Sequence, residues 1–297
     1  MVRIRRERAD SIESTAPLMA ETPIEVASLS KPVFAFAVVS AANRRELDLD
    51  APLPRWCPPP YRHWQRRQED DFDDAQLENV TARRILSHQG GLPNWSRDRP
   101  LSFIAAPGHE WSYSGEGYVL LQRALERAWR EPLEEFAQGL ALGPLGMSHS
   151  TYDPARASGR AVGHDRRGEP VESTVDRPVA ATSLLSTASD YARFVRHLTM
   201  APKDDPIVSA MVTPQVDVDT GRNLSWGLGV ALAEPEWFFH WGANPGFRSL
   251  FVGSRRRGEA VLVLTDGDGG MKAATAAVRQ SFGDLPLLDF PMLYPDD

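Results

Sequence analysis

The stretch VASLSKPVFAF, residues 26–36, places two serines, a lysine and a proline directly before an apolar run. Of the 33 lysine and arginine residues in the chain only three are lysines: Lys31, Lys203 and Lys272. Lysine can lose its proton when it is desolvated, whereas arginine stays charged. A lysine at a helix entrance in so arginine-rich a chain therefore indicates a role that arginine cannot fill.

Ser28 and Lys31 form a Ser-x-x-Lys pattern, and on a helix residues three apart share one face. Pro32 lacks an N–H and is tolerated in a first turn, which places Ser28 at or just before the helix N-terminus. A desolvated lysine that loses its charge can take the serine proton and make the hydroxyl a nucleophile. Ser30 points to a different side and is the weaker candidate. Alone the pattern has little specificity, since a serine cap followed by a solvated lysine gives the same letters.

The composition is that of a globular protein of 297 residues, with 42% hydrophobic and 25% charged residues. A net charge of −7 gives no reason to expect a nucleic-acid or membrane partner. The N-terminus lacks the apolar segment of a secretory signal, and Cys57 as the single cysteine excludes an internal disulfide. We therefore expect a cytoplasmic protein.

No H-E-x-x-H or C-x-x-C occurs, and we read DGDGG at 266–270 as a turn, so we expect no metal and no cofactor.

The order of segments predicts an α+β fold in a single domain, residues 1–297. After about residue 222, four short β-rich runs precede a closing helix, which predicts an antiparallel sheet flanked by helices. We assign an α/β lobe to approximately 1–47 and 215–297 and a mostly helical lobe to approximately 48–214. The first 27 residues leave room for one or two short strands, VRIRR and IEVA. The helical lobe contains amphipathic segments at 81–88, 116–130, 132–147 and 186–200.

Two further motifs follow in the chain. Tyr113-Ser114-Gly115 stands just before the segment from residue 116, and His240-Trp241-Gly242-Ala243 ends a predicted strand. With these motifs the chain resembles the serine β-lactamase-like superfamily, which contains class C β-lactamases, DD-peptidases and the related family VIII carboxylesterases. The three motifs of that superfamily, in order, are S-x-x-K, Y-x-N and [K/H]-x-G. The contexts ILSHQGGLP, LGPLGMSHS and LLSTASDYARF resemble it too, and the likeness covers about residues 24–268.

The resemblance implies a β-lactamase/transpeptidase-like fold, here with a shortened N-terminus, and a role for each motif residue. It implies that Ser28 is the acyl-accepting nucleophile, Lys31 its proton partner and Tyr113 the shuttle to the leaving group. His240 takes a cationic position, where it would bind a carboxylate or stabilise a tyrosinate. The backbone N–H groups of Ser28 and Ala243 would form the oxyanion hole.

Three departures from the pattern favour esters over lactams and peptides. Gly115 replaces an asparagine that helps to hold the acyl-side amide of such substrates, and Gly115→Asn is expected to narrow the gap between esters and lactams where the site geometry permits it. Trp241 replaces a hydroxyl residue with a large apolar wall, and the missing export signal disfavours a cell-wall role. The residues that we predict to bind substrate are Gly115, Trp241, Gly242, Asn244, Arg248, Trp95 and Trp111, with Phe247 as a further wall of an acyl pocket.

The sequence therefore predicts a serine hydrolase that acts on small carboxylic esters. A transacylase, a β-lactamase or a D-amino-acid amidase would need the same residues. A catalytically dead binding protein is a further alternative, against which the intact Ser28, Lys31, Tyr113 and His240 argue. The acyl group, the leaving group and the oligomeric state do not follow from the sequence.

Overall fold

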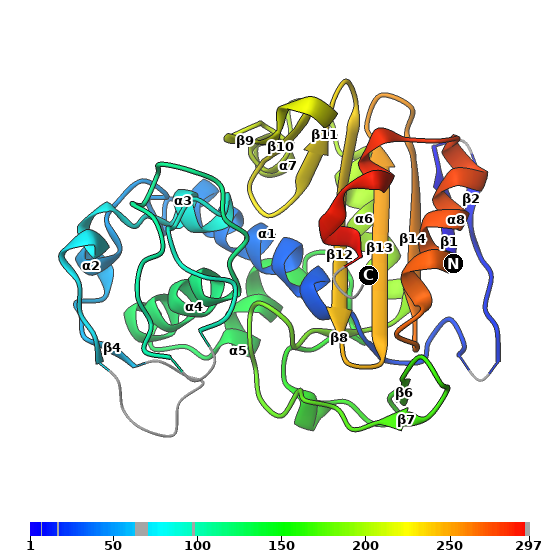
Figure 1. Ribbon diagram of the computed structural model, residues 1–297, viewed down its shortest axis with the longest axis horizontal. Helices are drawn as coiled ribbons and strands as arrows, with labels where there is room; N and C mark the ends of the chain where they lie inside the picture. The colour runs from blue at the N-terminus through cyan, green and yellow to red at the C-terminus, as the bar shows by residue number, and fades with distance from the viewer. Residues whose placement is uncertain (7, 17, 63–70, 97–98, 295–297) are drawn as a thin grey trace.

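An eight-stranded antiparallel sheet dominates one side of the molecule (Figure 1). The computed structural model describes residues 1–6, 8–16, 18–62, 71–96 and 99–294. The strand order is β2-β1-β14-β13-β12-β11-β10-β9, so an N-terminal hairpin pairs with the last strand of the chain. The strands are β1 Val2–Arg5, β2 Arg8–Ile12, β9 Val216–Asp219, β10 Leu224–Trp226, β11 Ala231–Ala233, β12 Trp237–Asn244, β13 Phe247–Ser254 and β14 Glu259–Thr265.

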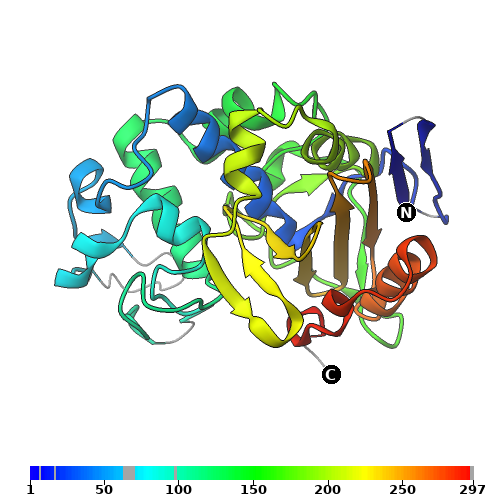
Figure 2. The same cartoon turned by 90° about the horizontal axis from the view of Figure 1, so that it is seen from above.

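The two faces of this sheet bury different hydrophobic clusters, because side chains alternate along each strand. Leu250 and Val252 of β13 pack in the cluster that includes α8 (Gly270–Phe282), whereas Phe251 between them packs in the cluster that includes α6 (Ala188–Met200). Figure 2 shows α8 on one side of the sheet and α6 on the other. The predicted α+β class, with an antiparallel sheet flanked by helices, is confirmed.

Helix α1 (Ser30–Asn43) lies between the sheet and the helices on the left of Figure 1. Its residues 30–41 are all buried, as expected for a helix that is apolar on every face. Two buried phenols fix its first turn: Tyr152 donates to the Ser30 carbonyl at 2.6 Å, and Tyr191 donates to the Leu29 carbonyl at 2.8 Å. The entrance of α1 is therefore held from two sides.

Side-chain oxygens cap the N-termini of two of the longer helices. Ser114 caps α4 by accepting from the Gly117 N–H at 2.8 Å, and Thr187 caps α6, where a serine or threonine cap is expected. The remaining helices are α2 Leu53–Trp56, η2 Ala75–Asn79, α3 Ala82–Leu86, α4 Gly115–Trp129, α5 Leu133–Ala137, η3 Gln138–Leu142, η4 Pro154–Arg156, α7 Pro206–Met211, η5 Thr220–Arg222, η6 Pro286–Asp289 and η7 Pro291–Leu293. Three two-stranded sheets pair β3 Ile24–Glu25 with β8 Leu185–Ser186, β4 Tyr61–Arg62 with β5 Asp71–Phe72, and β6 Gly163–His164 with β7 Pro170–Val171.

The turn η1 (Ala27–Leu29), which carries Ser28, packs against the end of β12. Strand β11 pairs with β12 only as far as Phe239, so residues 240–244 extend past β11. Gly242 permits the close approach of η1, because a Cβ there would lie 2.4 Å from the Val26 carbonyl oxygen and 2.3 Å from Ser249 Oγ. The Ser249 hydroxyl donates to the same Val26 carbonyl at 2.8 Å. A glycine thus brings the turn and the strand together.

Replacing Gly242 by alanine is expected to lower the free energy of unfolding by about 1–3 kcal/mol, because the new methyl group overlaps backbone and a buried hydroxyl. Gly139 is the matched control, since a Cβ there meets no atom within 4 Å. Urea unfolding of Gly242→Ala and Gly139→Ala tests the expectation. Equal stability of the two variants would contradict the close packing of η1 on β12.

Candidate active site

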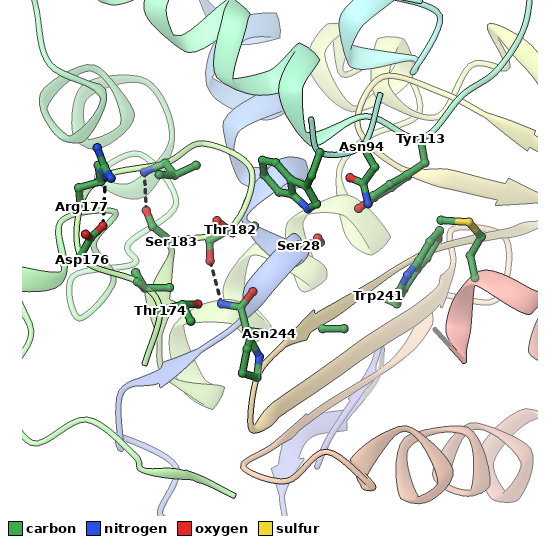
Figure 3. Close-up of a pocket in the computed structure, with 16 residues that line it drawn as sticks. Ser28, Asn94, Tyr113, Thr174, Asp176, Arg177, Thr182, Ser183, Trp241 and Asn244 are labelled. Atoms are coloured by element: carbon green, nitrogen blue, oxygen red, sulfur yellow. Dashed lines mark hydrogen bonds and ion pairs between the residues drawn. The ribbon is translucent and has the colours of Figure 1, made fainter. Parts of the chain in front are cut away.

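Ser28 lies in the wall of a cavity of about 580 Å³ (Figure 3). Ser28 is the second residue of η1. The first hydrogen bond within that turn runs from the Leu29 N–H to the Val26 carbonyl at 3.1 Å, so the N–H of Ser28 lies before it and is not used by the turn. Ala27 before it has a φ of +52°, in the left-handed region that is unfavourable for a residue with a Cβ. The cavity is also lined by Tyr113, Trp95, Asn94, Trp241, Ala243 and Asn244.

Lys31 approaches Ser28 from the protein interior. Its Nζ donates to Ser28 Oγ and to the Ala181 carbonyl, both at 3.0 Å, as the spacing of three residues predicts. The side chain is completely buried, and this burial lowers the pKa of the Lys31 amine to about 7. Among the described residues no carboxylate pairs with it. Near neutral pH the amine is therefore partly unprotonated and able to accept a proton.

Ser30, by contrast, has a structural role. Its hydroxyl donates to the Ala27 carbonyl at 2.6 Å and accepts from the Leu184 N–H at 2.9 Å, and the side chain is fully buried. Both contacts fasten the turn that carries Ser28 to the segment before β8. The preference for Ser28 over Ser30 agrees with this geometry.

Tyr113 lines the same cavity as Ser28, and the Lys31 Nζ lies 4.9 Å from the centroid of its ring. Burial raises the pKa of the Tyr113 phenol, and the Ser28 side chain opposes part of that rise. The phenol is therefore neutral in the free protein. Within the described chain its oxygen makes no hydrogen bond of ordinary geometry, and its ring stacks on Trp241 at 5.4 Å.

His240 does not fit the cationic role that the motif implies. It is fully buried, and burial together with the nearby Lys31 lowers the pKa of its imidazole to about 3. Its Nδ1 lies 2.7 Å from the Trp241 carbonyl oxygen, and the residue does not line the cavity. His240 is therefore not placed to bind a substrate carboxylate, and that part of the expectation is wrong. Its ring centroid lies 6.2 Å from that of Tyr113, and a role beside the phenol stays a prediction.

Gly115 is also not open to the cavity. A Cβ at this position would lie 2.5 Å from Cζ2 of Trp95 and 2.9 Å from the Asn94 carbonyl oxygen. The loop carrying Asn94 and Trp95 occupies the space into which a side chain at 115 would project. The geometry that Gly115→Asn would need is therefore not present, because an asparagine side chain at 115 has no room beside Trp95 and the Asn94 carbonyl.

The other predicted substrate-binding residues divide into two groups. Trp95 and Trp241 line the cavity, whereas Trp111, Phe247 and Gly242 do not. The Asn244 side chain faces inward to Glu25 Oε2 at 2.9 Å, although the residue contributes to the lining. Trp111 instead packs on Trp226 and Phe290 beneath the site.

Arg248 is the clearest misassignment. Its side chain is 6% exposed and is paired with Asp268 at 2.8 Å. The same guanidinium donates to the carbonyls of Asn244 at 2.7 Å and Phe247 at 2.9 Å. Arg248 thus locks the turn between β12 and β13, and the prediction that it binds substrate is wrong.

His88 is a site residue that the motif analysis did not single out. Its Nδ1 accepts from the Ser114 N–H at 3.0 Å, and its ring centroid lies 4.3 Å from that of Tyr113. Burial, Lys31 and His240 lower the pKa of His88, so its imidazole is neutral. His88 therefore supports the Tyr113-Ser114 segment. The sequence signal that could have identified His88 is its place in ILSHQGGLP, at the end of a short helix and before two glycines.

Among the described residues, no group of three or more histidine, cysteine, aspartate or glutamate side chains is placed to hold a metal ion. No helix in the described part of the chain has the length and apolarity needed to cross a membrane.

Replacing Lys31 by methionine is expected to stabilise the protein, most strongly at acid pH. The pKa of about 7 in the folded state is below the ordinary value of 10.5. Between these values the unfolded chain binds more protons, so the wild-type stability rises with pH through this window. The gain in Tm of Lys31→Met should therefore be larger at about pH 6 than at about pH 9, as measured by circular dichroism. Lys272→Met, at an exposed lysine, is the control, and a gain independent of pH would contradict the lowered pKa.

Comparison with known proteins gives a family match over most of the chain. Residues 5–282 match the family described as Beta-lactamase. Over 191 residues the chain is 31% identical to Esterase EstB of Burkholderia gladioli, a match that covers 54% of this chain and 46% of that protein. It is 25% identical over 284 residues to Penicillin-binding protein 4* of Bacillus subtilis, covering 80% and 59% of the two chains. The chain thus spans about half the length of the curated relatives it matches.

The fold is likewise shared with a solved structure, that of the octameric penicillin-binding protein homologue from Pyrococcus abyssi. The TM-score is 0.76 at 21% identity, with 99% of this chain and 75% of the other chain covered. The predicted β-lactamase/transpeptidase-like fold is confirmed. With a family match from residue 5 to residue 282, the chain belongs to the β-lactamase family.

Proposed function

We propose that the protein is a serine hydrolase that cleaves carboxylic esters through an acyl-enzyme on Ser28. The observation that carries the proposal is the pair of Ser28 Oγ and Lys31 Nζ, 3.0 Å apart in the wall of the cavity. A hydroxyl needs a base before it becomes a good nucleophile. An amine whose pKa is about 7 can act as that base at neutral pH.

In the acylation step, neutral Lys31 takes the proton of the Ser28 hydroxyl while Oγ attacks the ester carbonyl carbon. The carbonyl π electrons move to the oxygen, which becomes an oxyanion. The N–H of Ser28, which precedes the first hydrogen bond of η1, is one donor for this oxygen. The N–H of Ala243, in the part of β12 that extends past β11, is the second.

The tetrahedral intermediate then collapses and the C–O bond to the leaving alcohol breaks. The departing oxygen takes the proton that Lys31 received, relayed through the Tyr113 hydroxyl. A neutral phenol suits a relay, since it can donate one proton and accept another, and burial keeps Tyr113 neutral. In deacylation a water molecule attacks the acyl carbon, gives its proton back through the same groups, and releases the carboxylic acid and Ser28.

Two features of the cavity support esters as substrates. Trp241 and Trp95 give its wall apolar surface suited to an acyl chain, and a side chain at position 115 has no room. An unactivated ester needs only the nucleophile, the proton relay and the oxyanion donors. The similarity to Esterase EstB points the same way, whereas the similarity to a penicillin-binding protein keeps lactams and peptides as the alternative substrates.

The rate at which a fluorophosphonate probe labels Ser28 is expected to rise with pH, with a midpoint at about pH 7. Below this value Lys31 carries a proton and cannot accept that of Ser28, and above it the amine is free. Lys31→Arg should label at least about 10²-fold more slowly at every pH, because arginine does not release its proton. Intact-protein mass spectrometry against time gives both rates. A wild-type rate that is flat between about pH 5 and pH 9 would exclude Lys31 as the base.

Short and medium acyl esters are expected to give a higher kcat/KM than penicillins, cephalosporins or D-Ala-D-Ala peptides. A panel of p-nitrophenyl esters and lactams, with Ser28→Ala as the inactive control, tests this. Lactam turnover at or above the ester rate would instead indicate a β-lactamase. Esters formed from an added alcohol would indicate a transacylase, and absence of any acyl adduct would indicate a binding protein.

A further inference from the structure

The side chain of Asn244, at the end of β12, is held in one orientation. The residue lines the cavity, yet it is only 8% exposed. Its Nδ2 group donates to Glu25 Oε2 at 2.9 Å and to the Thr182 carbonyl oxygen at 3.4 Å. A carboxylate and a carbonyl are both acceptors, so the nitrogen end of the amide has to face them. The amide oxygen therefore points the other way.

This oxygen, Asn244 Oδ1, opens into the cavity. Among the described residues no group donates to it, and it does not belong to the polar atoms that the protein encloses completely. Since the residue is otherwise buried, the space that reaches Oδ1 is the cavity that Asn244 lines together with Ser28. Figure 3 shows the Asn244 amide with its nitrogen toward Thr182 and its oxygen turned away from that contact. The cavity wall thus presents a hydrogen-bond acceptor of fixed orientation.

A buried carboxylate lies behind this amide. Glu25 is 4% exposed and accepts hydrogen bonds from Asn244 Nδ2 and from the Ser173 hydroxyl. Within the described chain no basic side chain pairs with it. Hydrogen bonds in series polarise one another, so a carboxylate on the nitrogen side of an amide strengthens the acceptor on its oxygen side. The protein also screens the charge of Glu25 less than water does, which makes the potential at this part of the wall negative.

A ligand group that is both a hydrogen-bond donor and a cation fits this wall best. A hydroxyl group supplies a donor alone, whereas an ammonium group also offsets the charge of Glu25. The charged residues of the cavity lining, Asp176 and Arg177, pair with each other at 3.2 Å, so their charges offset one another. Ala243, to which we assign an oxyanion donor, directly precedes Asn244 in β12. The acceptor therefore stands close to the expected place of the reacting carbonyl.

We propose that the acyl group of the substrate carries an ammonium group near the reacting carbonyl, and that Asn244 Oδ1 accepts a hydrogen bond from this group. The substrate class is that of aminoacyl esters. Asn244 is then a specificity-determining residue, and Glu25 is a positioning residue that orients the Asn244 amide and supplies the opposite charge. The inference deepens the proposed function and rests on it.

Three methyl esters with one leaving group test the proposal: methyl 2-aminobutanoate, methyl 2-hydroxybutanoate and methyl 2-methylbutanoate, with both enantiomers measured. At about pH 7 the first carries an ammonium group, the second a neutral donor and the third neither. The readout is the ratio of kcat/KM values, in which effects of a variant on the reaction at Ser28 cancel. Asn244→Leu keeps the approximate shape and removes the acceptor. Its amino-to-methyl ratio is expected to fall at least about tenfold, as for a hydrogen bond to a charged group.

Glu25→Gln is the second variant, since it removes the charge and keeps an acceptor for the Asn244 amide. Its amino-to-hydroxy ratio is expected to fall about tenfold, whereas its hydroxy-to-methyl ratio should stay at the wild-type value. Glu172→Gln is the matched control, because Glu172 is exposed and outside the cavity lining, and wild-type ratios are expected. The proposal is overturned by an equal loss for all three esters in Asn244→Leu, or by an unchanged amino-to-hydroxy ratio in Glu25→Gln.

A binding measurement separates this proposal from the proposed function. NMR titration of the Ser28→Ala protein with 2-aminobutanamide and 2-methylbutanamide reports recognition without any reaction. Tighter binding of 2-aminobutanamide, lost on adding Asn244→Leu, supports the proposal even if wild-type Ser28 forms no acyl adduct. Equal affinities of the Ser28→Ala protein for the two amides overturn it even if Ser28 is acylated. This comparison needs no change at Asn244 or Glu25, so it also decides the question if those variants do not fold.

Discussion

The constraint on which this structure depends is the burial of a single amine. Lys31 is completely enclosed, and within the described chain it is paired with no carboxylate. A buried ammonium is costly, so the protein gains stability when the proton leaves. The surrounding packing keeps the Lys31 amine buried. Helix α1 is buried on every face, two phenols hold its first turn, and a glycine in β12 admits the turn that carries Ser28.

The features that the sequence predicted correctly are those that depend on local geometry. Residues three apart on a helix face the same way, so the contact of Ser28 with Lys31 follows from their spacing. Short β-rich runs separated by turn residues identified β12, β13 and β14, although the run at 223–233 is two short strands around a turn. The errors depended on packing between distant segments. Asp268 neutralises Arg248, and the protein interior encloses His240. The motif that contains Arg248 or His240 does not show which distant residues pack around it.

Aromatic rings pack closely around Tyr113 and Lys31. Five rings pack against one another: those of Tyr113, Trp226, Trp241 and the two neutral histidines His88 and His240. This packing keeps water and countercharge away from Lys31. Some polar atoms lack partners as a result: within the described residues His88 Nε2, His240 Nε2 and Trp226 Nε1 are buried without a hydrogen bond. Such groups lower stability, and a local exception of this kind is typical of functional sites.

The scarcity of lysine has a practical consequence for handling the protein. Lys203 and Lys272 are exposed, whereas Lys31 lies inside the core. Reagents that couple to primary amines therefore reach the side chains of Lys203 and Lys272, whereas the fold shields the buried Lys31 from them. Dyes, affinity handles and solid supports can be attached at known positions by ordinary amine chemistry. The arginine-rich surface, which this chemistry leaves untouched, then keeps its charge after coupling.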